Sequence, residues 1–371
     1  MRYVGAQEKE MDILILGNGF DLAHGLKTRY TDFLNYCVNQ LNRPNVYIPS
    51  DPFFTNMWIR HFLNVQQQLG NTWIDLEKEI YNVIKHISNF SFMNSQNCHK
   101  SFFIEFQDMS FNFYKFDKYI SNYSMEYRVL NREYYRLDEH NWINYHICFS
   151  SARGIINFLY DQLRDFTKQF NKYLLEQVLP IISNSQYKFG LSLLDKKIRI
   201  LSFNYTDTFE RLYNPINVHS KHKYIYVHGK VCDSKDCDLI LGTHSFYNHL
   251  PNDLNEEINV EFNVFKKHNQ RHRYGTIESY QNLLKELNNG LIIINPTFHV
   301  IGHSLDKADH NILRHIFKVR ENSTINIYYH NQEALERLIN NITEIIGEEE
   351  VMAKVRFIHQ EDPKRGILIP R

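Results

Sequence analysis

The stretch Ile-Leu-Ile-Leu-Gly-Asn-Gly-Phe-Asp, residues 13–21, joins an apolar run to an abrupt glycine turn. Four consecutive apolar residues are typical of a short strand buried on both faces of a parallel sheet. Gly17 and Gly19 let the backbone turn sharply, and from about Asp21 onward the apolar spacing becomes helical. The stretch therefore predicts a strand, a tight turn and a helix, and the amides of such a turn can point at an anion.

The glycine turn alone does not identify a ligand. Leu22 stands where the dinucleotide-binding fingerprint of dehydrogenases has its third glycine. A plain strand-to-helix turn is the alternative interpretation.

The C-terminal half alternates strand-like and helix-like segments. Helical patterns cover about 257–288, the segment from near Lys307, and 331–346, and the apolar runs predict strands at 198–203, 224–227, 298–301, 325–329 and 355–358. This alternation predicts an α/β fold with a Rossmann-like parallel sheet and right-handed crossovers. Ligands of such sheets lie outside the carboxyl ends of the strands.

The middle of the chain has a different residue pattern. Residues 43–195 carry long, polar, aromatic-rich segments with few strand signals, and apolar residues recur at helical spacing, as in Trp73–Ile80. We therefore predict a large α-helical insertion domain at 43–195. Residues 11–42 and 196–371 would form the α/β domain.

Composition narrows the class of protein. The 371 residues include 42 basic and 42 acidic residues, so no basic field supports nucleic-acid binding. No apolar run approaches the roughly 18 residues of a membrane span, and the polar start lacks a signal peptide's apolar core. We expect a cytoplasmic protein with reduced thiols and no structural metal, since Cys232 and Cys237 have no second cysteine pair.

Polar residues follow four of the predicted strands. They lie in the segments Gly17–Asp21, Asn204–Asp207, His228–Gly229 and Gly302–Asp306. Asn204 offers an amide donor and acceptor, and His228 a titratable ring, although a helix cap and a structural histidine are the simpler alternatives. Because these strands are expected in one sheet, we predict that their ends form one site.

The order of these motifs resembles a known family. Residues 15–33, Ile-Leu-Gly-Asn-Gly-Phe-Asp-Leu-Ala-His-Gly-Leu-Lys-Thr-Arg-Tyr-Thr-Asp-Phe, resemble the start of the bacteriophage abortive-infection AbiH family. Trp73–Glu77, Asn204–Asp207 and Val227–Gly229 also look like that family. The resemblance implies an anti-phage protein.

A more distant resemblance is to sirtuin-type NAD-binding domains, and it implies NAD as a substrate that is hydrolysed to nicotinamide and ADP-ribose. Asn204 and His228 would be catalytic, with Asp207 as the nearest acid. A second group of residues would bind the nucleotide: Gly17, Asn18, Gly19, Phe20, Asp21, Arg29, Gly302, Ser304 and Asp306.

The chain departs from the sirtuin pattern at two positions. Asp21 replaces a serine and would repel a pyrophosphate unless it caps a helix, and Thr206 replaces an aspartate. The four-cysteine zinc module of deacylating sirtuins is also missing, which favours hydrolysis of a nucleotide over protein deacylation.

Other interpretations remain open. A nucleotide-binding sensor without turnover fits the two departures, and the helical insertion would then signal to a partner or respond to a phage-derived trigger, with a homo-oligomer possible. A nuclease would use metal-binding histidines and aspartates: His219, His222, His228, His244, His249, Asp233, Asp236 and Asp238. Asp75 and Glu77 are either site carboxylates or solvated helix residues.

Overall fold

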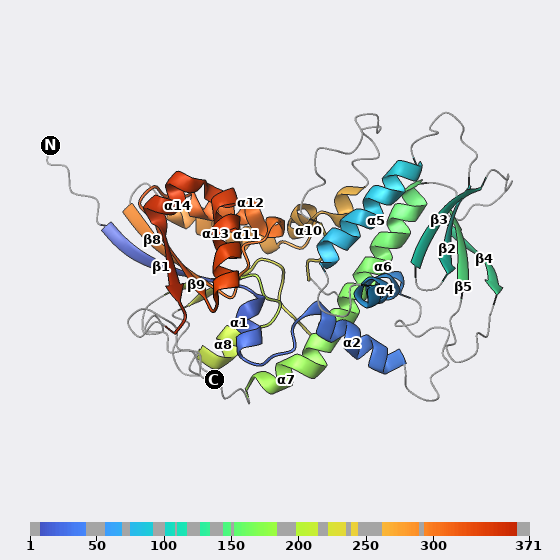
Figure 1. Ribbon diagram of the computed structural model, residues 1–371, viewed down its shortest axis with the longest axis horizontal. Helices are drawn as coiled ribbons and strands as arrows, with labels where there is room; N and C mark the ends of the chain where they lie inside the picture. Colours follow the sequence, from blue (N-terminus) through green and yellow to red (C-terminus); the bar gives the residue numbers. More distant parts are fainter. Residues whose placement is uncertain are drawn as a thin grey trace. The chain divides into compact units, whose positions relative to one another are not determined.

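The computed structural model describes the backbone of most of the chain (Figure 1). The described residues are 8–41, 56–68, 75–91, 101–107, 110–116, 127–133, 144–149, 152–183, 198–213, 222–234, 239–243, 262–288 and 293–361. They belong to two compact units. Unit 1 is Met1–Arg29, Asn171–Ile240 and Gln270–Arg371, and unit 2 is Tyr30–Phe170 and Leu241–Asn269.

Unit 1 is built on a six-stranded sheet in the order β10-β9-β8-β1-β6-β7. The strands are β1 (Glu8–Leu16), β6 (Arg199–Ser202), β7 (Lys223–Tyr226), β8 (Ile293–Ile301), β9 (Thr324–Tyr329) and β10 (Val355–His359). Every pairing is parallel, which confirms the predicted parallel α/β sheet. The strand order reverses between β1 and β8, the place where doubly wound sheets bind ligands.

Apolar side chains cover both faces of this sheet. One face of the strands packs on α11 (Thr276–Leu287), α12 (His310–Phe317) and α13 (Gln332–Ile346) in one core cluster (Figure 1). Leu14, Leu16 and Ile200 on the other face pack against Phe20 of α1 (Asn18–Ala23) and Phe209 of α8 (Thr208–Tyr213). Burial on both faces explains why β1 ends in the continuous apolar run Ile13–Leu16.

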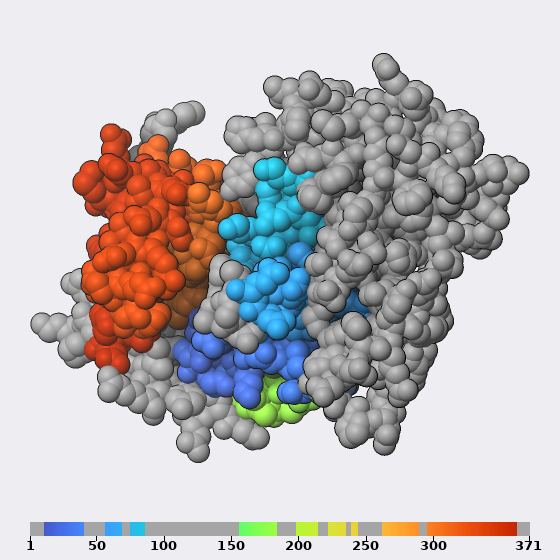
Figure 2. Space-filling model, turned by 45° about the vertical axis from the view of Figure 1, so that its right-hand side comes forward, coloured from blue at the N-terminus to red at the C-terminus, as the bar shows by residue number. Residues whose placement is uncertain are grey.

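The remaining helices of unit 1 are short. The end of α6 (Ala152–Tyr173) continues into a π-helical turn (Leu174–Val178) and α7 (Leu179–Ile182), and α14 (Glu348–Lys354) precedes β10. A 3-10 turn (Lys307–Asp309) leads into α12. The C-terminal part of the unit, orange to red, forms a continuous surface in Figure 2.

The prediction of one long helix over 257–288 is wrong. The structure has a 3-10 turn (Phe262–Phe265), then α10 (Lys267–Arg273) and then α11. Gly275 separates the two helices with φ of +71°, a left-handed conformation that ends a helix.

Unit 2 contains helices and a second sheet. The helices are α2 (Tyr30–Leu41), α4 (Met57–Gln68), α5 (Leu76–Ser91) and most of α6. The antiparallel sheet has the order β3-β2-β5-β4, from β2 (Ser101–Gln107), β3 (Ser110–Phe116), β4 (Tyr127–Glu133) and β5 (Asn144–Phe149). The prediction of an α-helical insertion is therefore wrong at these four strands, where aromatic and β-branched residues favour strands.

The glycine turn after β1 lies against the loop after β8. A Cβ on Gly17 would lie 2.4 Å from the Cα of His303, and one on Gly302 would lie 2.1 Å from the amide nitrogen of Phe20. Gly19 donates its amide to the Gly302 carbonyl at 2.8 Å. Side chains are thus excluded from this contact, which joins the ends of β1 and β8. Among the described helices, none is long and apolar enough to cross a bilayer.

Gly302→Ala should destabilise the protein much more than Gly275→Ala. Both glycines have positive φ, at +64° and +71°, so both substitutions cost on the order of 1–2 kcal/mol of backbone strain. Only the Cβ at position 302 would also collide with backbone, since nothing lies within 4 Å of a Cβ at 275. Thermal unfolding of the two variants measures the difference, and equal melting temperatures would contradict the steric argument.

Candidate functional site

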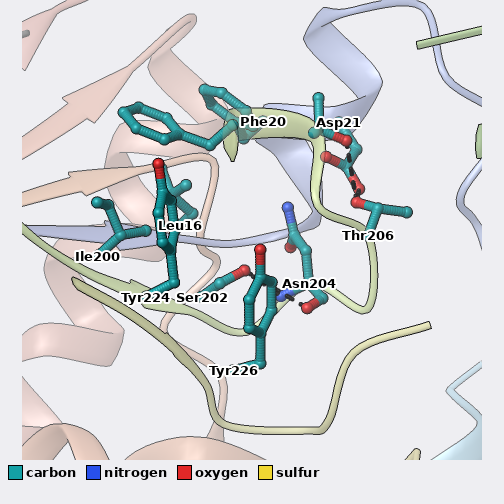
Figure 3. Close-up of a pocket in the computed structure, with 11 residues that line it drawn as sticks. Leu16, Phe20, Asp21, Ile200, Ser202, Asn204, Thr206, Tyr224 and Tyr226 are labelled. Atoms are coloured by element: carbon teal, nitrogen blue, oxygen red, sulfur yellow. Dashed lines mark hydrogen bonds between the residues drawn. The ribbon is translucent and has the colours of Figure 1, made fainter. Parts of the chain in front are cut away.

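A polar pocket lies in unit 1 where β1, β6 and β7 end (Figure 3). Helices α1 and α8 supply the rest of its wall, and its residues are Leu16, Phe20, Asp21, Ile200, Ser202, Asn204, Thr206, Thr208, Phe209, Tyr224 and Tyr226. Its empty volume is about 210 Å³, including space open to solvent.

Asp21 is the buried acid of this pocket. Its side chain is 1% exposed, and it accepts a 2.5 Å hydrogen bond from the Thr206 hydroxyl, which in turn accepts one from Thr208 at 3.0 Å. Burial raises the pKa of Asp21 from 3.8 to about 6, although Thr206, Thr208 and Asn204 partly offset the effect. Asp21 therefore lies inside α1 facing the pocket, and Gly17 precedes the helix as its N-cap.

The hydrogen bond between Asp21 and Thr206 joins two of the predicted strand-end segments directly.

Three buried oxygens of the pocket have no hydrogen-bond partner among the described residues. They are Asp21 Oδ1, Asn204 Oδ1 and the Tyr224 hydroxyl. The side chain of Asn204 reaches from the end of β6 toward α1, and its backbone amide donates to Ser202 Oγ at 3.2 Å (Figure 3). Leaving a buried polar atom unpaired costs about 1–3 kcal/mol, and native proteins carry few such atoms.

The amides of the glycine turn are already engaged. Gly17 donates to the Ile301 carbonyl at 3.1 Å, Gly19 to Gly302, and Phe20 to Gly17 at 2.9 Å. The side chain of Asn18 accepts a 2.6 Å hydrogen bond from Thr28. The glycines are needed here for close approach of the backbone, and a bound diphosphate would have to use other donors.

A second polar group, the histidine cluster, consists of His228, Arg271, His303 and Asp309. His228 Nε2 lies 3.1 Å from Asp309 Oδ1, and Arg271 donates to that oxygen at 3.3 Å. His303 Nε2 lies 3.8 Å from Asp309 Oδ2. Since the backbone of His303 lies against Gly17, the cluster is connected to the glycine turn.

Asn204 and His228 belong to different groups. Asn204 lines the pocket and His228 does not. The residues that flank Asn204 turn to the histidine cluster instead: the rings of Phe203 and Tyr205 lie 5.5 Å and 6.2 Å from that of His228. Alternate side chains of an extended segment point in opposite directions, so Asn204 faces the pocket.

The other predicted site residues have local partners. Asp207 pairs with Arg211 at 2.6 Å and with Lys230 at 3.3 Å, next to α8. Arg29 is exposed. Ser304 donates to Asp306 at 2.6 Å, and Asn341 of α13 donates to both of these residues, which ties the loop after β8 to that helix.

The carboxylates of the Trp73–Glu77 motif have structural partners in unit 2, and Trp73 itself lies outside the described residues. Asp75 caps α5, where the amide of Lys78 donates to it at 3.0 Å. Glu77 forms an ion pair with the buried Lys267.

Most of the histidines considered for a nuclease site, together with Asp236 and Asp238, also lie outside the described residues. His222 is buried, and Asp233 is exposed. Over the part of the chain that the structure describes, no group of three metal-ligating side chains is present.

Sequence reasoning missed Arg271, His303 and Asp309 as members of the cluster around His228. Arg271 sits in a helix with no motif, and Asp309 is one of two aspartates in Asp-Lys-Ala-Asp. Only the position of Asp309 just before α12, after the glycine-marked end of β8, could have drawn attention to it.

Comparison with known protein families shows which family the chain belongs to. The family model described as Bacteriophage abortive infection AbiH matches residues 13–330. The chain belongs to the AbiH family. It is therefore an anti-phage abortive-infection protein, and the match of this AbiH-family chain covers the glycine turn, the pocket and the histidine cluster. No curated protein matches the chain, and no solved structure does.

Asp21→Asn should change how stability depends on pH. The folded-state pKa of about 6 lies above the ordinary 3.8, so the contribution of Asp21 to the free energy of unfolding is fully present below about pH 4 and is lost as the pH rises through 6. At about 1.4 kcal/mol per pH unit, the loss approaches 3 kcal/mol. Asn lacks this titration, so the variant should gain stability relative to wild type between pH 4 and 7.

Thermal unfolding across that pH range measures the effect. Asp12→Asn, which removes a carboxylate of β1 that does not line the pocket, is the matched control. A difference between Asp21→Asn and wild type that stays constant with pH would contradict the assigned burial of the charge.

Proposed function

We propose that this AbiH-family protein hydrolyses NAD to nicotinamide and ADP-ribose at a sirtuin-like site. The observation that carries the proposal is the pair of buried oxygens without partners, Asp21 Oδ1 and Asn204 Oδ1, in one pocket at the strand ends. Both atoms are acceptors, and the hydroxyls of a ribose are donors. A ribosyl group in this pocket would satisfy both oxygens and offset the cost of burying them.

The negative charge of Asp21 suits the cleavage of the nicotinamide–ribose bond. The C1′–nitrogen bond breaks with its electron pair leaving on nicotinamide, through a state in which the ribose resembles an oxocarbenium ion. The oxygen of a water molecule then bonds to C1′ and loses a proton. With its pKa near 6, Asp21 is mainly ionised at neutral pH and can stabilise the positive ribose across a short distance.

The departing proton needs an acceptor. His228 supplies an imidazole at the same edge of the sheet, and general-base catalysis contributes on the order of 10²–10⁴ in rate. The small volume of the pocket leaves the adenosine and diphosphate outside it. Gly302, Ser304 and Asp306, at the exposed loop after β8, are the proposed contacts of the adenosine ribose.

Purified protein incubated with NAD should release nicotinamide, which chromatography quantifies. Asp21→Asn and Asn204→Ala should each slow release by about 10²-fold or more, because each removes an interaction with the positive ribose. His228→Ala should slow it by roughly 10²–10⁴. Each variant should keep a cooperative unfolding transition, and Asp12→Asn should release nicotinamide at the wild-type rate.

Unchanged release by Asp21→Asn and Asn204→Ala would remove the pocket from the reaction. Binding without turnover is the second candidate, and Asp21 and Thr206, the two departures from the sirtuin pattern, favour it. In that case NAD or ADP-ribose raises the melting temperature of the wild type by mass action, and no nicotinamide appears.

A further inference from the structure

The histidine cluster assigns the proton of His228 to one nitrogen. Arg271 lies with its terminal nitrogen 3.4 Å from Nδ1 of His228, and a guanidinium can only donate. Nδ1 is therefore the acceptor, and the neutral ring carries its proton on Nε2. That nitrogen lies 3.1 Å from the Asp309 carboxylate, which only accepts, so two separate contacts give the same tautomer.

Asp309 is itself held in place from two other directions. Arg271 donates to its Oδ1 at 3.3 Å. His303 accepts the amide of Leu305 on Nδ1 at 2.9 Å, so its own proton also sits on Nε2, 3.8 Å from Asp309 Oδ2. Leu305 is fully buried with φ of +59°, an uncommon backbone conformation for a residue with a side chain. The carboxylate thus faces three donors from separate segments of unit 1.

We propose that Asp309 is the positioning residue for His228. It keeps the imidazole in the tautomer whose Nδ1 lone pair can accept a proton, and Arg271 occupies that nitrogen in the resting state. The catalytic part of this role rests on the proposed hydrolysis: Arg271 gives way to the attacking water, the water proton passes to Nδ1, and Asp309 stabilises the resulting imidazolium. The contact of Arg271 with Nδ1 is longer than the usual 2.7–3.2 Å, so it is a weak bond to replace.

The same sheet contains a matched pair for comparison. His299 of β8 has Nε2 3.3 Å from Asp12 of β1 and Nδ1 3.2 Å from the Tyr328 hydroxyl. A tyrosine hydroxyl can donate or accept, so this pair lacks the guanidinium that fixes the roles at His228. Asp12 lies outside both the pocket and the histidine cluster.

¹⁵N NMR spectroscopy of the full chain, labelled with ¹⁵N-histidine, tests the tautomer of His228 without a measurement of activity. The wild type at pH 7.5 should show His228 with a protonated Nε2 and an unprotonated Nδ1, and His228→Gln identifies the signal by its loss. Arg271→Gln and Asp309→Glu should keep this tautomer because a carboxylate still faces Nε2. Asp309→Ala should lose it, whereas Asp12→Ala should alter the His299 signal alone.

A wild-type spectrum with the proton on Nδ1 would overturn the proposal, even if Asp309→Ala failed to fold. An Asp309→Ala spectrum with the His228 tautomer unchanged would overturn it as well. In the activity arm, Asp309→Ala should lower kcat for nicotinamide release about 10²–10⁴-fold, with KM for NAD little changed and partial recovery in Asp309→Glu. A wild type that releases no nicotinamide defeats the proposed hydrolysis, while the spectra still decide how His228 is positioned.

Discussion

The site of this protein depends on a contact between two pieces of backbone. Gly17 and Gly19 lie so close to Gly302 and His303 that a Cβ on any of the three glycines would fall within 3 Å of a neighbouring backbone atom. The contact joins the ends of β1 and β8, between which the strand order reverses. From there α1 carries Asp21 into the pocket on one side, and the loop after β8 carries His303 and Asp309 into the histidine cluster on the other.

The second constraint is the burial of Asp21. A carboxyl group that is 1% exposed costs free energy when it ionises, and Thr206, Thr208 and Asn204 do not fully offset that cost, so its pKa remains near 6. Groups shifted in this way, in a pocket at the end of parallel strands, are characteristic of functional sites. The same carboxylate repels a diphosphate but attracts a positive ribosyl group. We therefore propose that the ribose, and not the diphosphate, lies in the pocket.

Part of this organisation could be predicted from the sequence. The run at 13–16 identified the central strand β1, because burial on both faces requires continuous apolar residues. The glycine turn and Gly302 were both predicted at strand ends, but their close contact was not, since a backbone contact across the sheet leaves no local pattern. The prediction of helices in the insertion is wrong at β2–β5, which form a sheet, because aromatic residues among polar ones fit either a helix or a strand. Asp21 was predicted in the nucleotide site, but its partner Thr206, which lies 185 positions away in the chain, was not predicted. Arg271 and Asp309 carry no motif at all.

Several groups of the proposed site in unit 1 are engaged in internal contacts. The turn amides donate to carbonyls, and Arg271 occupies Nδ1 of His228. The proposed reaction also uses Nδ1 of His228, so catalysis has to exchange its contact with Arg271 for one with the attacking water. An abortive-infection enzyme that consumes NAD would harm its own cell if this exchange were easy. In the proposed reaction NAD itself must favour the active arrangement, by binding it more tightly than the resting one. The strength of the contacts that Arg271 and Asp309 make with His228 would then set how large this difference in affinity has to be.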